Sequence, residues 1–126
     1  MLPFARAGLA APLLVASLLV AACGGDGGGG SASGAIAVTS TDTACEVAVT
    51  SAPAGEVTFA VANDGSETTE FYVYEEDGTT IVGEVEGIGP GLTRDLTVDL
   101  EQGTYVTACK PGEKGDGIRA PFQVTG

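Results

Sequence analysis

Residues 92–112 read LTRDLTVDLEQGTYVTACKPG, and this stretch decides the fold class of the chain. Between residues 92 and 100, leucine and valine alternate with polar residues, which is the period of two of a strand with one buried face. A Gln-Gly turn then leads to a second run, Thr104–Ala108, which ends at Cys109 and a glycine-rich loop over residues 110–117. The stretch therefore predicts two successive β-strands joined by a tight turn.

The remainder of the chain from Ala35 onward repeats this pattern of short alternating runs between turns. No window shows a helical period, and the segment Ser51–Glu56 reads as a turn because it contains a proline and a glycine. The other predicted strands are Ala35–Thr41, Glu46–Thr50, Val57–Asn63, Glu70–Glu75, Ile81–Val85 and Ala120–Val124. The sequence thus predicts an all-β protein, a Greek-key β-sandwich of about eight strands, in one domain over residues 35–126.

The first 34 residues have the composition of an export signal and a tether. Residues 1–22 carry a single charge, and the apolar run Leu9–Ala22 is too short for a comfortable membrane span, so a signal peptide is predicted. The run ends in Val-Ala-Ala-Cys23, which resembles the bacterial lipobox and implies acylation of the Cys23 thiol. The alternative is an ordinary secretory signal with Cys23 as a free thiol. Residues 23–34 are predicted to be the lipidated cysteine and a flexible Gly/Ser tether.

The composition excludes several classes of chemistry. The chain has 126 residues, 5 Lys and Arg, 17 Asp and Glu and no His, which gives a net charge of −12. Without histidine there is no His general base, no Ser-His-Asp or Cys-His nucleophile pair and no imidazole metal ligand. The negative charge disfavours nucleic acid as a partner, since that needs a basic patch. We therefore predict a protein that is not an enzyme and binds no nucleic acid.

Two segments resemble the cupredoxins. Residues 103–112, GTYVTACKPG, are similar to the cupredoxin strand that carries a Tyr and leads through a Cys into a Pro- and Gly-containing loop. The earlier segment from Pro53 to Asn63 resembles the cupredoxin strand pattern P-x-G-x-V-x-F-x-x-x-N. The resemblance implies a cupredoxin-like fold from Ala35 to the last residue. A type 1 copper site is excluded, because it needs two His and usually a Met, and the only Met is Met1.

A narrower resemblance is to the cupredoxin-like domain of EfeO-type iron-uptake lipoproteins. That domain carries an early Cys-Glu pair, a Glu in place of the first histidine and a late Cys, and this chain has Cys45, Glu46, Glu70 and Cys109 in that order. The helical, imelysin-like domain of EfeO proteins has no counterpart in the sequence. The resemblance therefore implies a free-standing copy of the cupredoxin-like module.

The same four residues form the predicted metal site. If Cys45, Glu46, Glu70 and Cys109 converge at one end of the sandwich, two thiolates and the carboxylates could bind a copper or iron ion. The alternative is a disulfide between Cys45 and Cys109, since two cysteines remain in the exported domain once Cys23 is set aside. Glu70 is also compatible with an exposed strand end, and its alternation leaves open which face of the strand is buried. A further group of carboxylates, which includes Glu84 and Glu86, reads mainly as a solvated surface.

Two functions follow from these observations. The first is a membrane-anchored, extracytoplasmic lipoprotein that handles a copper or iron ion with its cupredoxin-like domain. Its partners would be the lipid bilayer, through acylated Cys23, the metal ion and an envelope protein. The second is a disulfide-stapled interaction lipoprotein that keeps the sandwich and binds no metal.

Overall fold

The computed structural model describes residues 34–126, so the predicted signal peptide, Cys23 and the tether before Gly34 lie outside the described residues. Nine strands and one short 3-10 turn are found in residues 34–126. The elements are β1 (Ile36–Ser40), β2 (Cys45–Val47), β3 (Ser51–Pro53), β4 (Gly55–Asn63), β5 (Thr69–Glu75), β6 (Ile81–Ile88), β7 (Thr93–Leu100), β8 (Gly103–Cys109), η1 (Pro111–Glu113) and β9 (Ile118–Thr125). The all-β prediction is confirmed.

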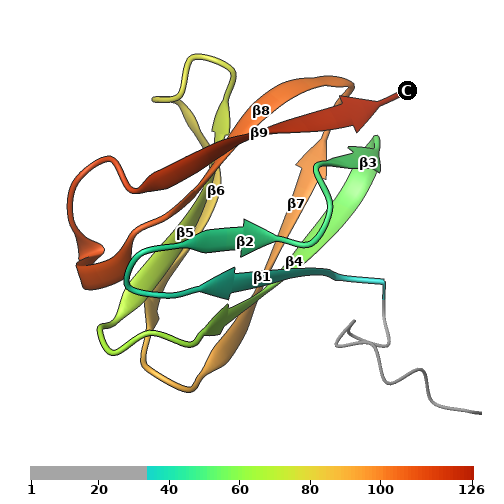
Figure 1. Ribbon diagram of the computed structural model, residues 1–126. Helices are drawn as coiled ribbons and strands as arrows, with labels where there is room; N and C mark the ends of the chain where they lie inside the picture. The colour runs from blue at the N-terminus through green and yellow to red at the C-terminus, as the bar shows by residue number, and fades with distance from the viewer. Residues whose placement is uncertain (1–33) are drawn as a thin grey trace, which may run out of the picture.

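The strands form two sheets that pack face to face (Figure 1). The four-stranded sheet has the order β2-β1-β4-β7, and the five-stranded sheet has the order β3-β9-β8-β5-β6. Two of the pairings are parallel, β1 with β4 and β3 with β9, and the others are antiparallel. The chain crosses between the sheets several times, as in a β-sandwich with Greek-key connections.

The predicted turn at Ser51–Glu56 is wrong for most of its length, because Ser51–Pro53 forms the edge strand β3 and Gly55 and Glu56 begin β4, which leaves only Ala54 between them. The register of β3 with β9 pairs Ser51 with Gln123 and Pro53 with Thr125. A proline cannot donate a ladder hydrogen bond, but an edge strand needs donors on one side only. Pro53 therefore marks an edge of the sheet as well as a turn.

The core lies between the sheets and follows the predicted alternation. On β4, Val57, Phe59 and Val61 all face inward, with exposed fractions of 6% or less. The ring of Phe59 lies 5.2 Å from that of Phe71 and 5.4 Å from that of Phe122, so three strands meet at one aromatic cluster. The two sheets also approach closely at Gly83 on β6. A Cβ at this position would collide with the side chain of Val98 on β7, so the packing requires a glycine there.

The two ends of the sandwich are distinct, and they are named here by what lies beside them. At the loop end, Cys109 pairs with Ile118 across the loop of residues 110–117. At the tether end, β3 pairs with the last residues of β9, close to Gly34, where the described chain begins. Figure 1 shows the loop and the start of the coloured chain on opposite sides of the molecule.

Candidate functional site

A disulfide joins the two sheets near the loop end. The sulfur atoms of Cys45, on β2, and Cys109, at the end of β8, are bonded, and their Cα atoms are 5.5 Å apart. Cys109 is fully buried and Cys45 is partly buried against the same core. Of the two arrangements that the sequence leaves open for these residues, the structure has the disulfide. Because a cysteine binds a metal ion as its thiolate, neither sulfur is a ligand while the disulfide is formed.

The structure also separates the two glutamates of the predicted metal site from the cysteines. Cys45 and Glu46 are neighbours on β2, so their side chains point to opposite faces of the strand, and Glu46 is exposed. On β5, it is Phe71 that pairs with Cys109 and faces the core, so Glu70 points to the outer face. The four residues therefore do not converge, which corrects the expectation of a single mixed thiolate–carboxylate site.

Glu70 instead belongs to a cluster on the outer face of the five-stranded sheet. The Tyr72 hydroxyl lies 3.0 Å from Glu70 Oε2 and 3.3 Å from Glu86 Oε1 and donates toward both carboxylates. A phenol has only one hydrogen to donate, so two carboxylates share it. Glu70, Tyr72 and Glu86 are called the oxygen cluster below.

The surroundings of the oxygen cluster keep Tyr72 protonated. Burial raises the pKa of Tyr72 well above its usual value, and the hydrogen bond to Glu70 and the negative charges of Glu70, Glu84 and Glu86 act in the same direction. The ring of Tyr72 stacks on that of Tyr74 at 5.4 Å. The phenol is therefore held more firmly in its neutral form than an ordinary tyrosine.

Two basic side chains cover the stacked rings. Lys110 Nζ lies 4.2 Å from the centre of the Tyr72 ring, and the Arg119 guanidinium lies 4.7 Å from that of Tyr74. The backbone N–H of Lys110 also donates to the Glu70 carbonyl at 2.9 Å, which holds the start of the loop against β5. Cation–π contacts of this kind fix the orientation of both rings. The loop after Cys109 therefore shapes the oxygen cluster from one side.

The sequence placed Tyr72 on the same face of its strand as Glu70, but it did not indicate that the two interact or that Glu86 joins them. Tyr72 is two positions further along the same strand, so the period of two places it on the same face as Glu70. Glu86 arrives from β6, where Glu84 pairs with Tyr72, and that register was not readable from the sequence. Within residues 34–126, no three His, Cys, Asp or Glu side chains lie close enough together to hold a metal ion. No helix in the same part of the chain is long and apolar enough to span a membrane.

The family model for the cupredoxin-like domain matches residues 11–118 of the chain. The chain belongs to the cupredoxin-like domain family. Solved structures agree on this fold: reduced auracyanin from Roseiflexus castenholzii superimposes with a TM-score of 0.62 at 19% identity, covering 73% of this chain and 97% of that chain. An azurin from Methylomonas sp. strain J gives a TM-score of 0.55 at 14% identity over 71% of this chain and 96% of that chain.

Sequence relatives of this cupredoxin-like domain include the iron uptake system component EfeO. The Yersinia pestis protein is 34% identical over 74 residues, and the Escherichia coli (strain K12) protein is 31% identical over 74 residues. In both cases the match covers 59% of this chain but only 19% of the relative. The chain thus spans about a fifth of the length of the curated relatives that it matches.

The copper ion that gives blue-copper cupredoxins their colour does not fit the residues of this domain. A type 1 site takes two imidazoles, a Cys thiolate and a weak axial ligand, usually Met. The sequence has no His, its only Met is Met1, and Cys109 is in a disulfide. The domain therefore shares the fold of the blue-copper proteins without their ligand set.

Proposed function

We propose that this chain is an extracytoplasmic lipoprotein, held at a lipid bilayer by acyl chains on Cys23, whose cupredoxin-like domain handles an iron ion as cargo. The lipobox-like residues before Cys23 support the anchor. The similarity to EfeO, an iron uptake system component, supports the choice of iron and of an envelope protein as partner. The role is binding and transfer rather than catalysis.

The oxygen cluster is the binding site that we assign to the iron ion. The single observation that carries this assignment is that Glu70 and Glu86 come from different strands and both reach the Tyr72 hydroxyl. Carboxylate and phenolate oxygens are hard donors, which suit a hard cation such as Fe(III) better than the soft Cu(I) that thiolates select. With both sulfurs in the disulfide, the remaining donors favour iron over copper.

The two carboxylates of the oxygen cluster are at least partly exposed to solvent, which suits a site that binds an ion and then transfers it to a partner. Glu86 is exposed and Glu70 is half-buried, so water can complete the coordination and a partner can approach. The net charge of −12 attracts cations to the surface as a whole. A site with few protein ligands and open positions releases its ion more readily than a closed one.

Replacing either carboxylate of the oxygen cluster tests this function. We expect Glu70→Gln and Glu86→Gln each to weaken Fe(III) binding by at least about tenfold, the scale on which loss of a group at a metal site acts. The measurement is calorimetric titration of the chain with citrate-buffered Fe(III). The matched control is Glu76→Gln, which removes an exposed carboxylate from the turn after β5.

Two results would contradict the assignment. One is the absence of stoichiometric Fe(III) binding to the unaltered chain, and the other is an equal loss in Glu76→Gln, which would mean non-specific attraction to a negative surface. The first result would favour the alternative, a disulfide-stapled lipoprotein that binds a protein partner and no metal. The Cys45–Cys109 disulfide supports this alternative, because it stabilises the sandwich without any metal.

A further inference from the structure

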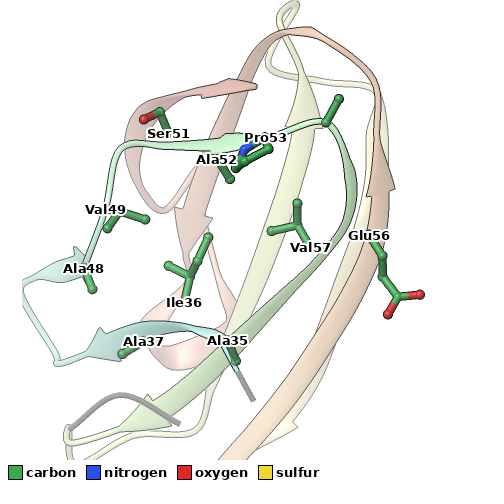
Figure 2. Close-up of a pocket in the computed structure, with 12 residues that line it drawn as sticks. Ala35, Ile36, Ala37, Ala48, Val49, Ser51, Ala52, Pro53, Glu56 and Val57 are labelled. Carbon is green, nitrogen blue, oxygen red and sulfur yellow. The ribbon is translucent and has the colours of Figure 1, made fainter. Parts of the chain in front are cut away.

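An apolar pocket opens between the two sheets at the tether end, away from the oxygen cluster. Its volume is about 760 Å³, within the range of pockets that hold small ligands. β1, β3, β4 and the segment between β2 and β3 line it, and the lining includes Ile36, Ala37, Val49, Ala52, Pro53 and Val57. Figure 2 shows Ile36, Ala52 and Val57 around the space and Glu56, the only charged residue of the lining, pointing away from it.

The pocket is left open because its walls are made of small side chains. Five of its twelve lining residues are alanines, while Ile36 and Ala52 continue the main core. Because the space is partly open to solvent, its apolar lining is left in contact with water rather than with larger side chains. Val49 at its rim is 45% exposed. An apolar occupant would bury this surface.

We infer that the occupant is one acyl chain of the lipid on Cys23 of the same molecule. This inference rests on the acylation of Cys23 in the proposed function. Gly34 lines the pocket, and Cys23 lies eleven positions before it in the sequence. A glycine-rich random coil of that length has a root-mean-square span of about 18 Å, a distance that would keep the lipid close to the opening.

The size and chemistry of the pocket agree with this occupant. A methylene occupies about the same room as a water molecule, about 30 Å³, so a sixteen-carbon chain needs about 480 Å³. The pocket offers room on that scale along a space that is partly open to solvent, and its one charged lining residue, Glu56, points away from it (Figure 2). Tethering also raises the effective concentration of the acyl chain to the millimolar range, which favours it over a free ligand.

An acyl chain bound in this pocket would set the orientation of the domain relative to the membrane. The remaining acyl chains would stay in the bilayer and hold the tether end against it. Because the loop end lies at the other end of the strands, the oxygen cluster would then face away from the membrane, toward a partner.

The test uses the full chain, labelled during expression with a fatty acid that carries a photoreactive diazirine, and reconstituted in phosphatidylcholine vesicles. After irradiation, we expect mass spectrometry to find cross-links between the fatty acid and peptides that contain Ile36, Val49 or Val57. Ala52→Phe fills part of the pocket and should lower this yield by at least about tenfold. Each methylene group that the phenyl ring displaces from the pocket weakens binding about fourfold, so displacing two is enough. The matched control is Ala62→Phe, on β4 near the loop end, which should leave the yield unchanged.

A second variant guards against misfolding of Ala52→Phe. Val49→Asp places a charge at the exposed rim and should also lower the yield, with the unfolding transition unchanged. Cross-links only to vesicle lipid, equal yields in all variants or cross-links into a second copy of the chain would each overturn the inference. If the same spectra show no fatty acid on Cys23, the anchor and the pocket occupant both fail. Fatty acid on Cys23 without pocket cross-links overturns the pocket inference alone.

Discussion

Replacing both Cys45 and Cys109 with alanine is expected to lower the free energy of unfolding by about 4 kcal/mol. The disulfide closes a loop with a sequence separation of 64, so it removes many conformations from the unfolded chain. It also joins β2 to β8, which belong to different sheets. Urea unfolding of the double variant, in a Cys23→Ala background that leaves no third thiol, measures the effect.

Reduction of the same Cys23→Ala chain is the control for this prediction. Reduction breaks the cross-link without creating the small cavity that alanine leaves at fully buried Cys109. The losses of unfolding free energy on reduction and in the double variant therefore give a lower and an upper value for the contribution of the disulfide. A change within about 0.5 kcal/mol, the scatter of surface substitutions, would show that the disulfide does not stabilise the sandwich.

Phe59→Ala is expected to destabilise the domain by about 3–5 kcal/mol. The side chain is fully buried, and its ring contacts those of Phe71 and Phe122, so its removal leaves a cavity where the two sheets meet. Thermal or urea unfolding measures the change. Leu92→Ala is the control, because Leu92 is 54% exposed and its truncation should change stability by no more than about 0.5 kcal/mol.

A loss at Phe59 no larger than that at Leu92 would mean that the sheets do not pack through this ring cluster. The free energy of unfolding of Phe59→Leu is a second test of the same packing. It keeps most of the apolar volume, so its loss should fall well below that of Phe59→Ala.

The strands were largely predictable where a strand buries one face and exposes the other, as β4 and β7 do. The alternation in residues 92–100 matches Leu96, Val98 and Leu100 in the core. The short edge strand β3 was not predictable. It has only three residues, and it exists because it pairs with β9, more than 60 residues away, rather than because of its own composition.

For Cys45 and Cys109 the sequence predicted two arrangements, a disulfide and a metal site shared with Glu46 and Glu70, and the structure has the disulfide. The order of Cys45, Glu46, Glu70 and Cys109 along the chain does not say which face each residue occupies. For Cys45 and Glu46 the answer was in the sequence, because adjacent residues on a strand point to opposite faces. For Glu70 it was not, because Tyr72 and Tyr74 on one face and Phe71 on the other are all apolar enough to be buried.

In the structure both faces of β5 are covered, which explains the ambiguity. Phe71 packs in the core between the sheets, while Tyr72 and Tyr74 are shielded on the outer face by Lys110 and Arg119. The long side chains of these cations lie over the rings and keep their charges in water. Whether these two side chains cover the rings depends on the fold of the loop after Cys109. The hydrophobic periodicity of β5 therefore cannot predict it.

The central claim is that this cupredoxin-like domain binds iron through oxygen atoms while its cysteines stay bonded. Its most direct test is a titration of the disulfide-intact chain with Fe(III), followed by the visible charge-transfer absorption of an iron–phenolate bond. We predict that the band appears without reductant, grows as the pH rises because the Tyr72 proton must leave, is lost in Tyr72→Phe and persists in Tyr74→Phe. Iron binding that appears only after reduction frees Cys45 and Cys109 would contradict the claim and restore a thiolate site.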